Sequence, residues 1–142
     1  MVLRLVLGAV FTGMAVGQLA SATDMPALLG AYGLVHGFPA AVLTAGLIAG
    51  ELVCGVWFLA RPRSGALAPV WVYTAVALVW SALAVQAYAR RLVVDNCGCF
   101  GNHLAQRLSW IVLAQDGLIL LYAVLLLRSA RTARPDSGAA RP

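Results

Sequence analysis

The sequence contains no lysine and few charged residues of any kind. All ten basic residues are arginines, and only five aspartates and glutamates accompany them in 142 residues. Charged residues make up 11% of the chain and apolar residues 62%, whereas typical soluble domains have about 25% and about 45–50%. So small a soluble domain would have too little polar surface to cover itself. The composition therefore excludes an ordinary soluble fold and indicates a protein surrounded by lipid.

The net charge of +5 does not indicate nucleic-acid binding. The arginines lie at the edges of apolar runs, which is the pattern of membrane topology and not of a basic binding face. We therefore expect lipid, and no nucleic acid, around this chain.

Four apolar runs are long enough to cross a bilayer. A hydrocarbon core of about 30 Å requires about 20 helical residues, and none of the runs alternates between apolar and polar residues as a β-strand would. The sequence predicts an all-α membrane protein, a four-helix bundle formed by one domain over residues 1–128. The expected helices span 3–20, 39–60, 66–88 and 109–127.

The last residues differ in composition from the rest of the chain. Residues 129–142 are rich in arginine, alanine and proline and lack an apolar run. Such a segment cannot bury enough apolar surface to order itself, so we expect a disordered tail.

The arginine distribution predicts the orientation. Cytoplasmic loops carry an excess of arginine and lysine, and a cytoplasmic N-terminus places seven arginines inside and three outside. We therefore expect an inner-membrane protein with both termini in the cytoplasm and the 89–108 loop outside it. The inner set is Arg4, Arg61, Arg63, Arg128, Arg131, Arg134 and Arg141, and the outer set is Arg90, Arg91 and Arg107.

Two pairs of glycines have the spacing of close helix packing. Gly13 and Gly17 lie in the first run, and Gly46 and Gly50 lie in the second. Small residues let backbones approach where lipid gives no hydrophobic drive to association. We expect the first two long helices to pack through these glycines. The pattern also favours a retained first helix, although Ala20-Ser21-Ala22 resembles a signal-peptide cleavage site.

Two closely spaced cysteines are the main chemical feature of the sequence. Cys97 and Cys99 flank Gly98 in the loop before the last helix, on the side where disulfides persist. A disulfide across one residue closes a small, strained ring, and strained disulfides are readily reduced. Nearby arginines would lower the pKa of a thiol there. These properties favour a redox pair that exchanges disulfides with a partner.

Two other interpretations of the pair remain open. A permanent disulfide would shape the turn, although so short a loop gains little stability from a bridge. Alternatively, Cys97, Cys99 and His103 could bind a soft metal such as copper, zinc or mercury, with Asp95 as a fourth ligand. This set lacks the usual four-ligand pattern of structural zinc.

Several polar residues lie inside the expected helices. Glu51 lies roughly 18 Å into the second helix, where a carboxylate is costly, so we expect it to face the bundle and to handle protons or contact a quinone. Asp116 and Gln18 are expected to share a polar pocket beneath the cysteine loop, and Asp116 is the other carboxyl group that could handle protons. Trp80 is mid-span, where it could line a cofactor pocket instead of the aromatic belt. Cys54 lies too deep to join the cysteine pair and is expected to pack in the core.

The segment Asp95-Asn96-Cys97-Gly98-Cys99-Phe100-Gly101 resembles the motif of the MauE family of methylamine-utilisation membrane proteins, within a wider DoxX-like group of four-helix proteins. Two further features are similar: a glycine-rich first helix that starts after Arg4, and Glu51 followed by a glycine in the second helix. The resemblance covers about residues 2–128. One departure is Gln18, where this group is expected to have a lysine. That difference removes the expected charge partner of Glu51 or Asp116.

The resemblance implies a redox-associated membrane protein. It implies that Cys97 and Cys99 are the redox pair, that Glu51 is a functional carboxylate, and that a quinone is the candidate acceptor. The implied partner is an exported thioredoxin-like protein or a maturing dehydrogenase subunit. A non-enzymatic assembly subunit with a structural disulfide is the alternative function of a different class, beside soft-metal binding.

Overall fold

The computed structural model describes residues 1–132, which form five helices and no strands. Four of the helices are long: α1 (Val2–Ala20), α3 (Phe38–Ala60), α4 (Ala68–Ala89) and α5 (Trp110–Thr132). The fifth, α2 (Met25–Gly30), is a single short helix between α1 and α3. The all-α prediction is therefore confirmed for the described part of the chain.

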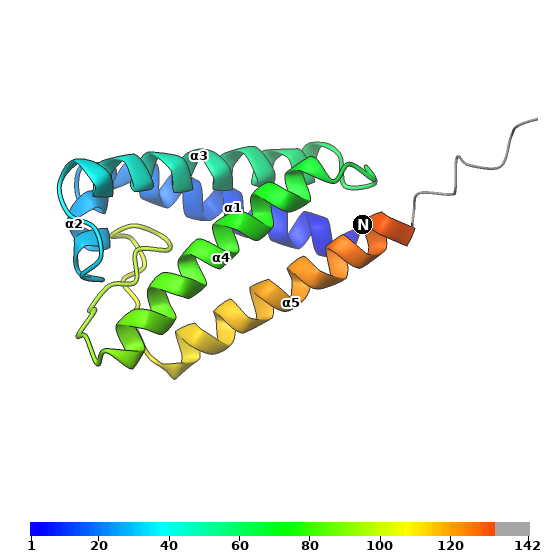
Figure 1. The fold of residues 1–142 in the computed structure, drawn as a ribbon. Coiled ribbons are helices and arrows are strands. Elements are labelled where there is room, and N and C mark those ends of the chain that lie inside the picture. The colour runs from blue at the N-terminus through cyan, green and yellow to red at the C-terminus, as the bar shows by residue number, and fades with distance from the viewer. Residues whose placement is uncertain (133–142) are drawn as a thin grey trace, which may run out of the picture.

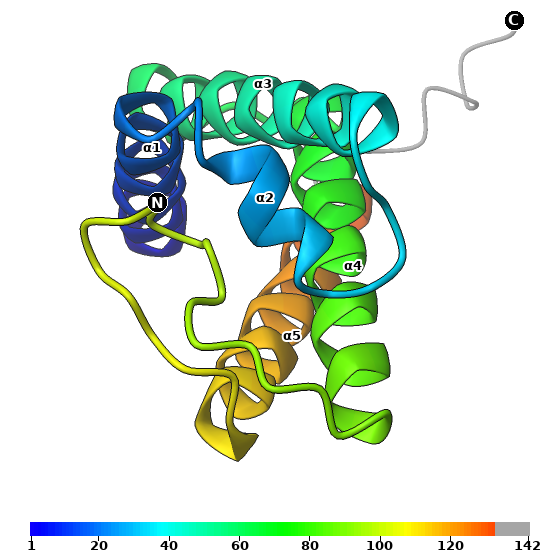
Figure 2. The ribbon, with the colours of Figure 1, turned by 90° about the vertical axis from the view of Figure 1, so that its left-hand side faces the viewer.

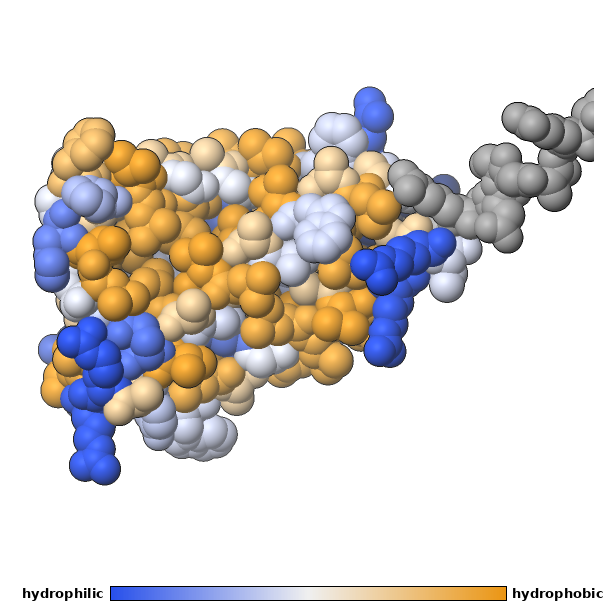
Figure 3. All heavy atoms as spheres, in the orientation of Figure 1, coloured by the Kyte–Doolittle hydropathy of each residue, from blue (hydrophilic) through white to orange (hydrophobic). Residues whose placement is uncertain are grey.

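All four long helices have the length and the apolar composition needed to cross a membrane. Their outward surfaces form an apolar band, and hydrophilic side chains gather at the two ends of the molecule (Figure 3). A chain whose middle is apolar and whose ends are polar fits a bilayer. The protein is a multi-pass membrane protein.

The long helices pack in the order α1, α3, α4 and α5, each mainly against the next one in this series. The most extensive contact joins α1 to α3, followed by α4 to α5 and α3 to α4. In Figure 1, α1 lies behind α3, and α4 and α5 cross the bundle obliquely. Helices α1 and α5 make no extensive contact with each other. This leaves one side of the bundle less tightly closed than the others.

One end of the bundle carries α2 and the loop between α4 and α5, and Figure 2 views the molecule from this end. The chain start and the end of α5 lie at the opposite end (Figure 1). Helix α2 was not predicted, because it lies in the connection between the first two expected helices, 3–20 and 39–60. Helix α2 packs on α3, and its own side chains Met25 and Leu29 are fully buried.

Local sequence explains several helix ends. Pro39 and Pro69 lie in the first turns of α3 and α4, where the missing N–H is not needed. Helix α3 ends just before Arg61-Pro62, as expected when a proline follows.

The last helix runs beyond its predicted end. We expected residues from 129 onward to be disordered, but α5 continues to Thr132. Ala130 is buried at 3% exposure, and the Ser129 and Thr132 hydroxyls donate to helix carbonyls. The rest of the expected tail, residues 133–142, lies outside the described residues.

Glycines mediate the α1–α3 contact, but they are not the predicted ones. Gly8 and Gly55 face each other, and a Cβ on Gly55 would lie 2.8 Å from the Thr12 backbone nitrogen. A Cβ on Gly46 would meet nothing within 4 Å. The predicted packing partner is thus confirmed, whereas the predicted contact glycines are wrong. Glycine spacing marks where backbones can approach, not which neighbour fills the space.

Candidate functional site

The cysteine loop is folded by the side chain of Asn96. Its Oδ1 accepts a hydrogen bond from the Gly98 amide at 3.0 Å, and its Nδ2 donates to the Gly101 carbonyl at 3.0 Å. Gly98 and Gly101 both have positive φ, at 79° and 62°, which favours glycine. The motif therefore encodes a compact double turn that holds both cysteines.

The loop is seated tightly on the end of α1. A Cβ on Gly17 would lie 2.7 Å from the Phe100 carbonyl oxygen, and one on Gly101 would lie 2.6 Å from Ser21 Oγ. Ser21 Oγ accepts from the Asn102 amide at 3.0 Å. Gly17 therefore receives the cysteine loop and does not pack against a neighbouring helix as predicted. Any larger side chain here would lift the loop.

The two thiols lie side by side under this loop. Their sulfur atoms are 3.3 Å apart, and both cysteines are free thiols in this structure. The hydrogen bond between them lowers the pKa of Cys97 to about 7, although burial acts in the opposite direction. The same bond and burial raise the pKa of Cys99 well above its ordinary value. Near neutral pH Cys97 therefore supplies the thiolate and Cys99 keeps its proton.

The arginines do not stabilise the thiolate as the sequence led us to expect. Arg107 pairs with Asp95 at 3.2 Å, and both side chains are mostly exposed. Arg90 is exposed and donates to Gln86 at 3.4 Å. Because the neighbouring thiol gives the largest effect, the pair activates itself.

The Cys97 backbone is also fixed from the turn that follows α2. The buried Tyr32 hydroxyl donates to the Cys97 carbonyl at 2.9 Å. Burial raises the pKa of Tyr32, so its hydroxyl keeps the proton that it donates. On the other side, the Cys97 amide donates to the Gln106 carbonyl at 2.8 Å. Both bonds hold the turn in place independently of the thiol chemistry.

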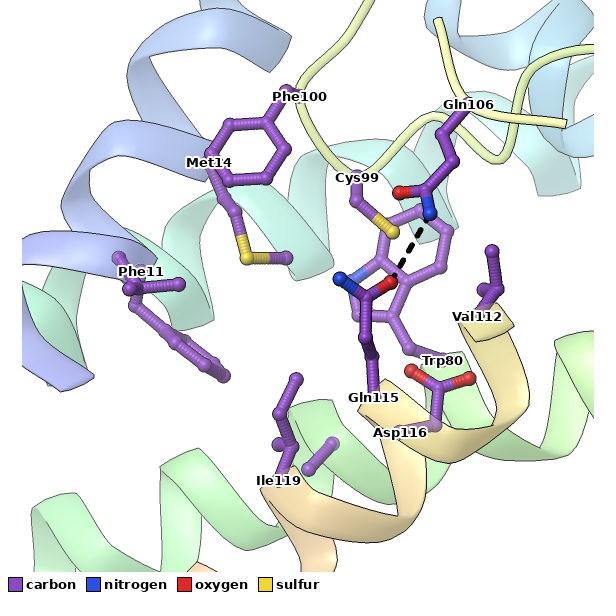
Figure 4. Close-up of a pocket in the computed structure, with 12 residues that line it drawn as sticks. Phe11, Met14, Trp80, Cys99, Phe100, Gln106, Val112, Gln115, Asp116 and Ile119 are labelled. Atoms are coloured by element: carbon purple, nitrogen blue, oxygen red, sulfur yellow. Dashed lines mark hydrogen bonds between the residues drawn. The ribbon is translucent and has the colours of Figure 1, made fainter. Parts of the chain in front are cut away.

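A cavity of about 280 Å³ lies beneath Cys99 (Figure 4). It lies among α1, α4, α5 and the cysteine loop, next to the open side between α1 and α5. Val10 at its rim is 38% exposed, so the cavity borders the outer surface of the helices. Its lining residues are mostly apolar: Val10, Phe11, Met14, Ala77, Trp80, Cys99, Phe100, Gln106, Val112, Gln115, Asp116 and Ile119.

Three polar side chains face this cavity from one side. Gln106 Nε2 donates to Gln115 Oε1 at 3.2 Å (Figure 4). Asp116 lies one residue further along α5 and is 8% exposed. Within residues 1–132 its carboxyl group has no hydrogen-bond or ion-pair partner. An unpartnered acid in an apolar cavity costs stability, so its presence indicates a role toward a ligand.

Glu51 has a different environment. It is fully buried and accepts a hydrogen bond from Trp80 Nε1 at 2.6 Å and one from Gln18 Nε2 at 2.9 Å. Gln18 Nε2 also donates to the Cys99 carbonyl at 3.0 Å. Glu51 thus connects the Trp80 wall of the cavity to the backbone of the cysteine loop.

The polar pocket expected for Gln18 and Asp116 is not formed. Gln18 does not line the cavity, because its amide is held by Glu51 behind Trp80. Of the residues that the sequence singled out, the cavity therefore brings together Cys99, Trp80 and Asp116. Gln18 and Glu51 form a separate pair next to it.

Two other predicted residues stay apart from the thiol pair. Cys54 is fully buried in the core next to the Glu51 carbonyl, as expected for a packing residue. His103 is exposed on the loop, and no group of three or more His, Cys, Asp or Glu side chains in residues 1–132 is placed to hold a metal ion. The set of Cys97, Cys99 and His103 is therefore not assembled.

Sequence reasoning missed the residues that build the turn and its seat. Asn96 stands directly before the cysteine pair, and asparagine commonly bonds the backbone two residues on, so its position was a usable signal. Tyr32 and Ser21 gave no such signal, because their contacts depend on how α2 and the loop meet.

These features define a class: a four-helix membrane protein that holds a dithiol over an intramembrane cavity. Residues 1–128 match the family model described as methylamine utilisation protein MauE, and the chain belongs to this family. No curated protein and no solved structure matches the chain.

Proposed function

We propose that this protein is a membrane thiol–disulfide redox protein. Cys97 and Cys99 would pass electrons between an exported partner and an acceptor in the membrane. The observation that carries the proposal is the placement of a self-activated dithiol at the roof of a cavity that borders the lipid. A purely structural cysteine pair needs neither a lowered pKa nor a cavity.

The proposed electron transfer has two steps. A partner dithiol reduces the Cys97–Cys99 disulfide by exchange and becomes a disulfide itself, with the Cys97 thiolate formed near neutral pH. The restored dithiol then gives two electrons and two protons to an acceptor and closes its disulfide again. Run in reverse, the same steps would reduce the partner.

We propose a quinone as the acceptor, and the lining of the cavity supports this choice. The lining offers aromatic and thioether surfaces from Phe11, Met14 and Trp80, together with a polar side at Gln115 and Asp116. A quinone, when bound, supplies a two-electron, two-proton acceptor that dissolves in the bilayer. Cys99 lies at the cavity as the donating thiol, and Asp116 is the group that can move a proton there.

The orientation gives the dithiol an exported partner. Arg4, Arg61, Arg63, Arg128 and Arg131 all belong to the end opposite the cysteine loop. The excess of arginine at that end supports a cytoplasmic location for it. The cysteine loop would then lie outside the cytoplasm of the inner membrane, where a thioredoxin-like or maturing protein can reach it. The family description, methylamine utilisation protein MauE, suggests that the proposed electron transfer serves methylamine utilisation.

The proposal is tested with the full chain reconstituted in lipid vesicles. Dithiothreitol serves as the electron donor and a short-chain ubiquinone as the acceptor, and the absorbance of the quinone reports turnover. We expect the wild-type protein to catalyse this transfer and the Cys97→Ser/Cys99→Ser variant to lose it. Cys54→Ser is the matched control and should keep it. Full turnover in the double variant would end the proposal.

Alkylation followed by mass spectrometry separates the proposal from its alternatives. A Cys97–Cys99 disulfide that opens under mild reduction supports the redox role. A bridge that resists reduction supports a structural role instead, and free thiols with bound copper or zinc support metal binding.

A further inference from the structure

A buried arginine lies at the end of the molecule away from the cysteine loop. Arg4 is only 7% exposed, although it carries a full charge in the first turn of α1. Its guanidinium donates to the Ser64 carbonyl and lies 5.5 Å from the centre of the Phe58 ring. These two neighbours occupy part of the guanidinium, which has five N–H donors. Neither neighbour carries a compensating charge.

No carboxylate compensates Arg4 within residues 1–132. The four acidic side chains of this part of the chain are Asp24, Glu51, Asp95 and Asp116. The one ion pair found there joins Arg107 to Asp95, in the cysteine loop at the other end. Burying an unpaired charge is costly. Among residues 1–132, the charge of Arg4 is therefore left without an anionic partner.

Arg4 opens into a hollow of about 290 Å³ that we call the inner arginine hollow. Its lining comes from the start of α1, the turn between α3 and α4, and the end of α5: Met1, Arg4, Pro62, Arg63, Ser64, Gly65, Ser129 and Ala130. A Cβ on Gly65 would meet nothing within 4 Å, so the turn leaves the hollow open. The space is far larger than the roughly 30 Å³ share of one water molecule.

The chemistry of the lining selects an anion. Arg63 adds a second guanidinium, held at Met1 by a hydrogen bond of 3.2 Å from its Nε to the Met1 sulfur. Met1 and Arg4 at the start of α1 line the hollow, where the positive end of the helix dipole also favours negative charge. Two guanidinium groups around one space suit the oxygens of a phosphate group.

We propose that the inner arginine hollow binds the phosphate group of an anionic phospholipid. The hollow lies where the membrane helices begin and end, at the level of lipid head groups. Lipids with a net negative charge attract arginines at the cytoplasmic surface, which is where the arginine counts place this end. The bound phosphate would connect the start of α1 to the end of α5, two helices that make no extensive contact with each other.

The test uses the purified full chain in detergent and thermal unfolding with added lipid. Phosphatidylglycerol should raise the unfolding temperature of the wild-type protein, and uncharged phosphatidylcholine should not. Arg63→Gln removes one exposed guanidinium of the hollow and should require about fivefold more phosphatidylglycerol for the same shift. Arg61→Gln is the matched control. Arg61 has the same charge in the same turn, but it lies over Trp57, outside the hollow.

Arg4→Gln should lose the response to phosphatidylglycerol altogether, provided that the variant folds. If Arg4→Gln does not fold, Arg63→Gln provides a second readout. Native mass spectrometry then counts the phosphatidylglycerol molecules that this variant retains after delipidation. An equal shift with inorganic phosphate would overturn a lipid source. Equal losses in Arg61→Gln and Arg63→Gln, or equal effects of the two lipids, would overturn the site itself.

Discussion

Glu51 and Asp116 are the two carboxyl groups that the long helices carry into the apolar region, and their surroundings differ. Glu51 is fully buried and receives hydrogen bonds from Trp80 and Gln18. Asp116 is 8% exposed, faces a cavity and has no partner within residues 1–132. Both carboxyl groups were expected from the sequence to handle protons.

The difference separates a positioning residue from a candidate catalytic residue. The two hydrogen bonds of Glu51 fix one wall of the cavity and, through Gln18, the backbone of the cysteine loop. Asp116 fixes nothing, but it shares the cavity with Cys99. A buried carboxyl group whose hydrogen bonds are all made within the protein stabilises the structure. A buried carboxyl group without a partner is a candidate for contact with a bound ligand.

The largest expected effect is on turnover in Asp116→Asn. The amide keeps the size of the side chain but cannot take up or release a proton, so we expect turnover from dithiothreitol to ubiquinone to fall about 100-fold. Thermal unfolding in detergent should stay at the same temperature or shift upward, because the costly carboxyl group has no partner to lose. Normal turnover in this variant would remove Asp116 from the proposed chemistry.

Glu51→Gln should show the opposite result, with a loss of stability. A glutamine can accept only one of the two hydrogen bonds in the same position, and its NH₂ would face the second donor. Leaving one buried donor unsatisfied costs about 1–3 kcal/mol, which thermal unfolding measures.

Ser81→Ala is the matched control for that variant. Ser81 Oγ is buried on α4 without a hydrogen-bond partner, so its removal should leave stability unchanged or raise it, by up to about 1–3 kcal/mol. A Glu51→Gln variant as stable as Ser81→Ala would contradict the positioning role.

Hydropathy alone predicted the four long helices, because a bilayer imposes one length and one composition on a spanning helix. The pairing of the first two long helices was also correct. Their contact glycines were not, since Gly8 and Gly55 meet where Gly13 and Gly17 had been expected with Gly46 and Gly50. Small residues occur on several faces of such helices, so spacing does not choose among them.

The cysteine pair could be found in the sequence, but the sequence did not show which neighbouring group has the largest effect on the thiol pKa. Flanking arginines looked like the source of a low thiol pKa, yet they lie exposed and are paired elsewhere. The relevant neighbour of Cys97 is Cys99, and that follows from the turn that Asn96 folds. Likewise, the different roles of Glu51 and Asp116 depend on which helix face meets Trp80. A single sequence does not record that packing.

The smallest expected effect concerns the pH dependence of Cys97 alkylation. The pKa of Cys97 is about 7, set first by the hydrogen bond from Cys99 and opposed by burial. Its alkylation rate should therefore reach half of its maximum near pH 7 and level off about one unit higher. The negative charge of Asp116 raises the pKa of Cys97. Asp116→Asn should therefore move the midpoint to lower pH, by less than about one unit.

Glu51 should differ from Asp116 in its effect on Cys97. The charge of Glu51 raises the pKa of Cys99, but it is not among the causes that shift the pKa of Cys97. Glu51→Gln should leave the Cys97 midpoint where it is in the wild-type protein. Iodoacetamide labelling of the reduced protein, with mass spectrometry to separate Cys97 from Cys99, measures both midpoints. Equal shifts in the two variants would mean that both carboxyls act on the thiolate alike, and the division between a positioning and a catalytic acid would fail.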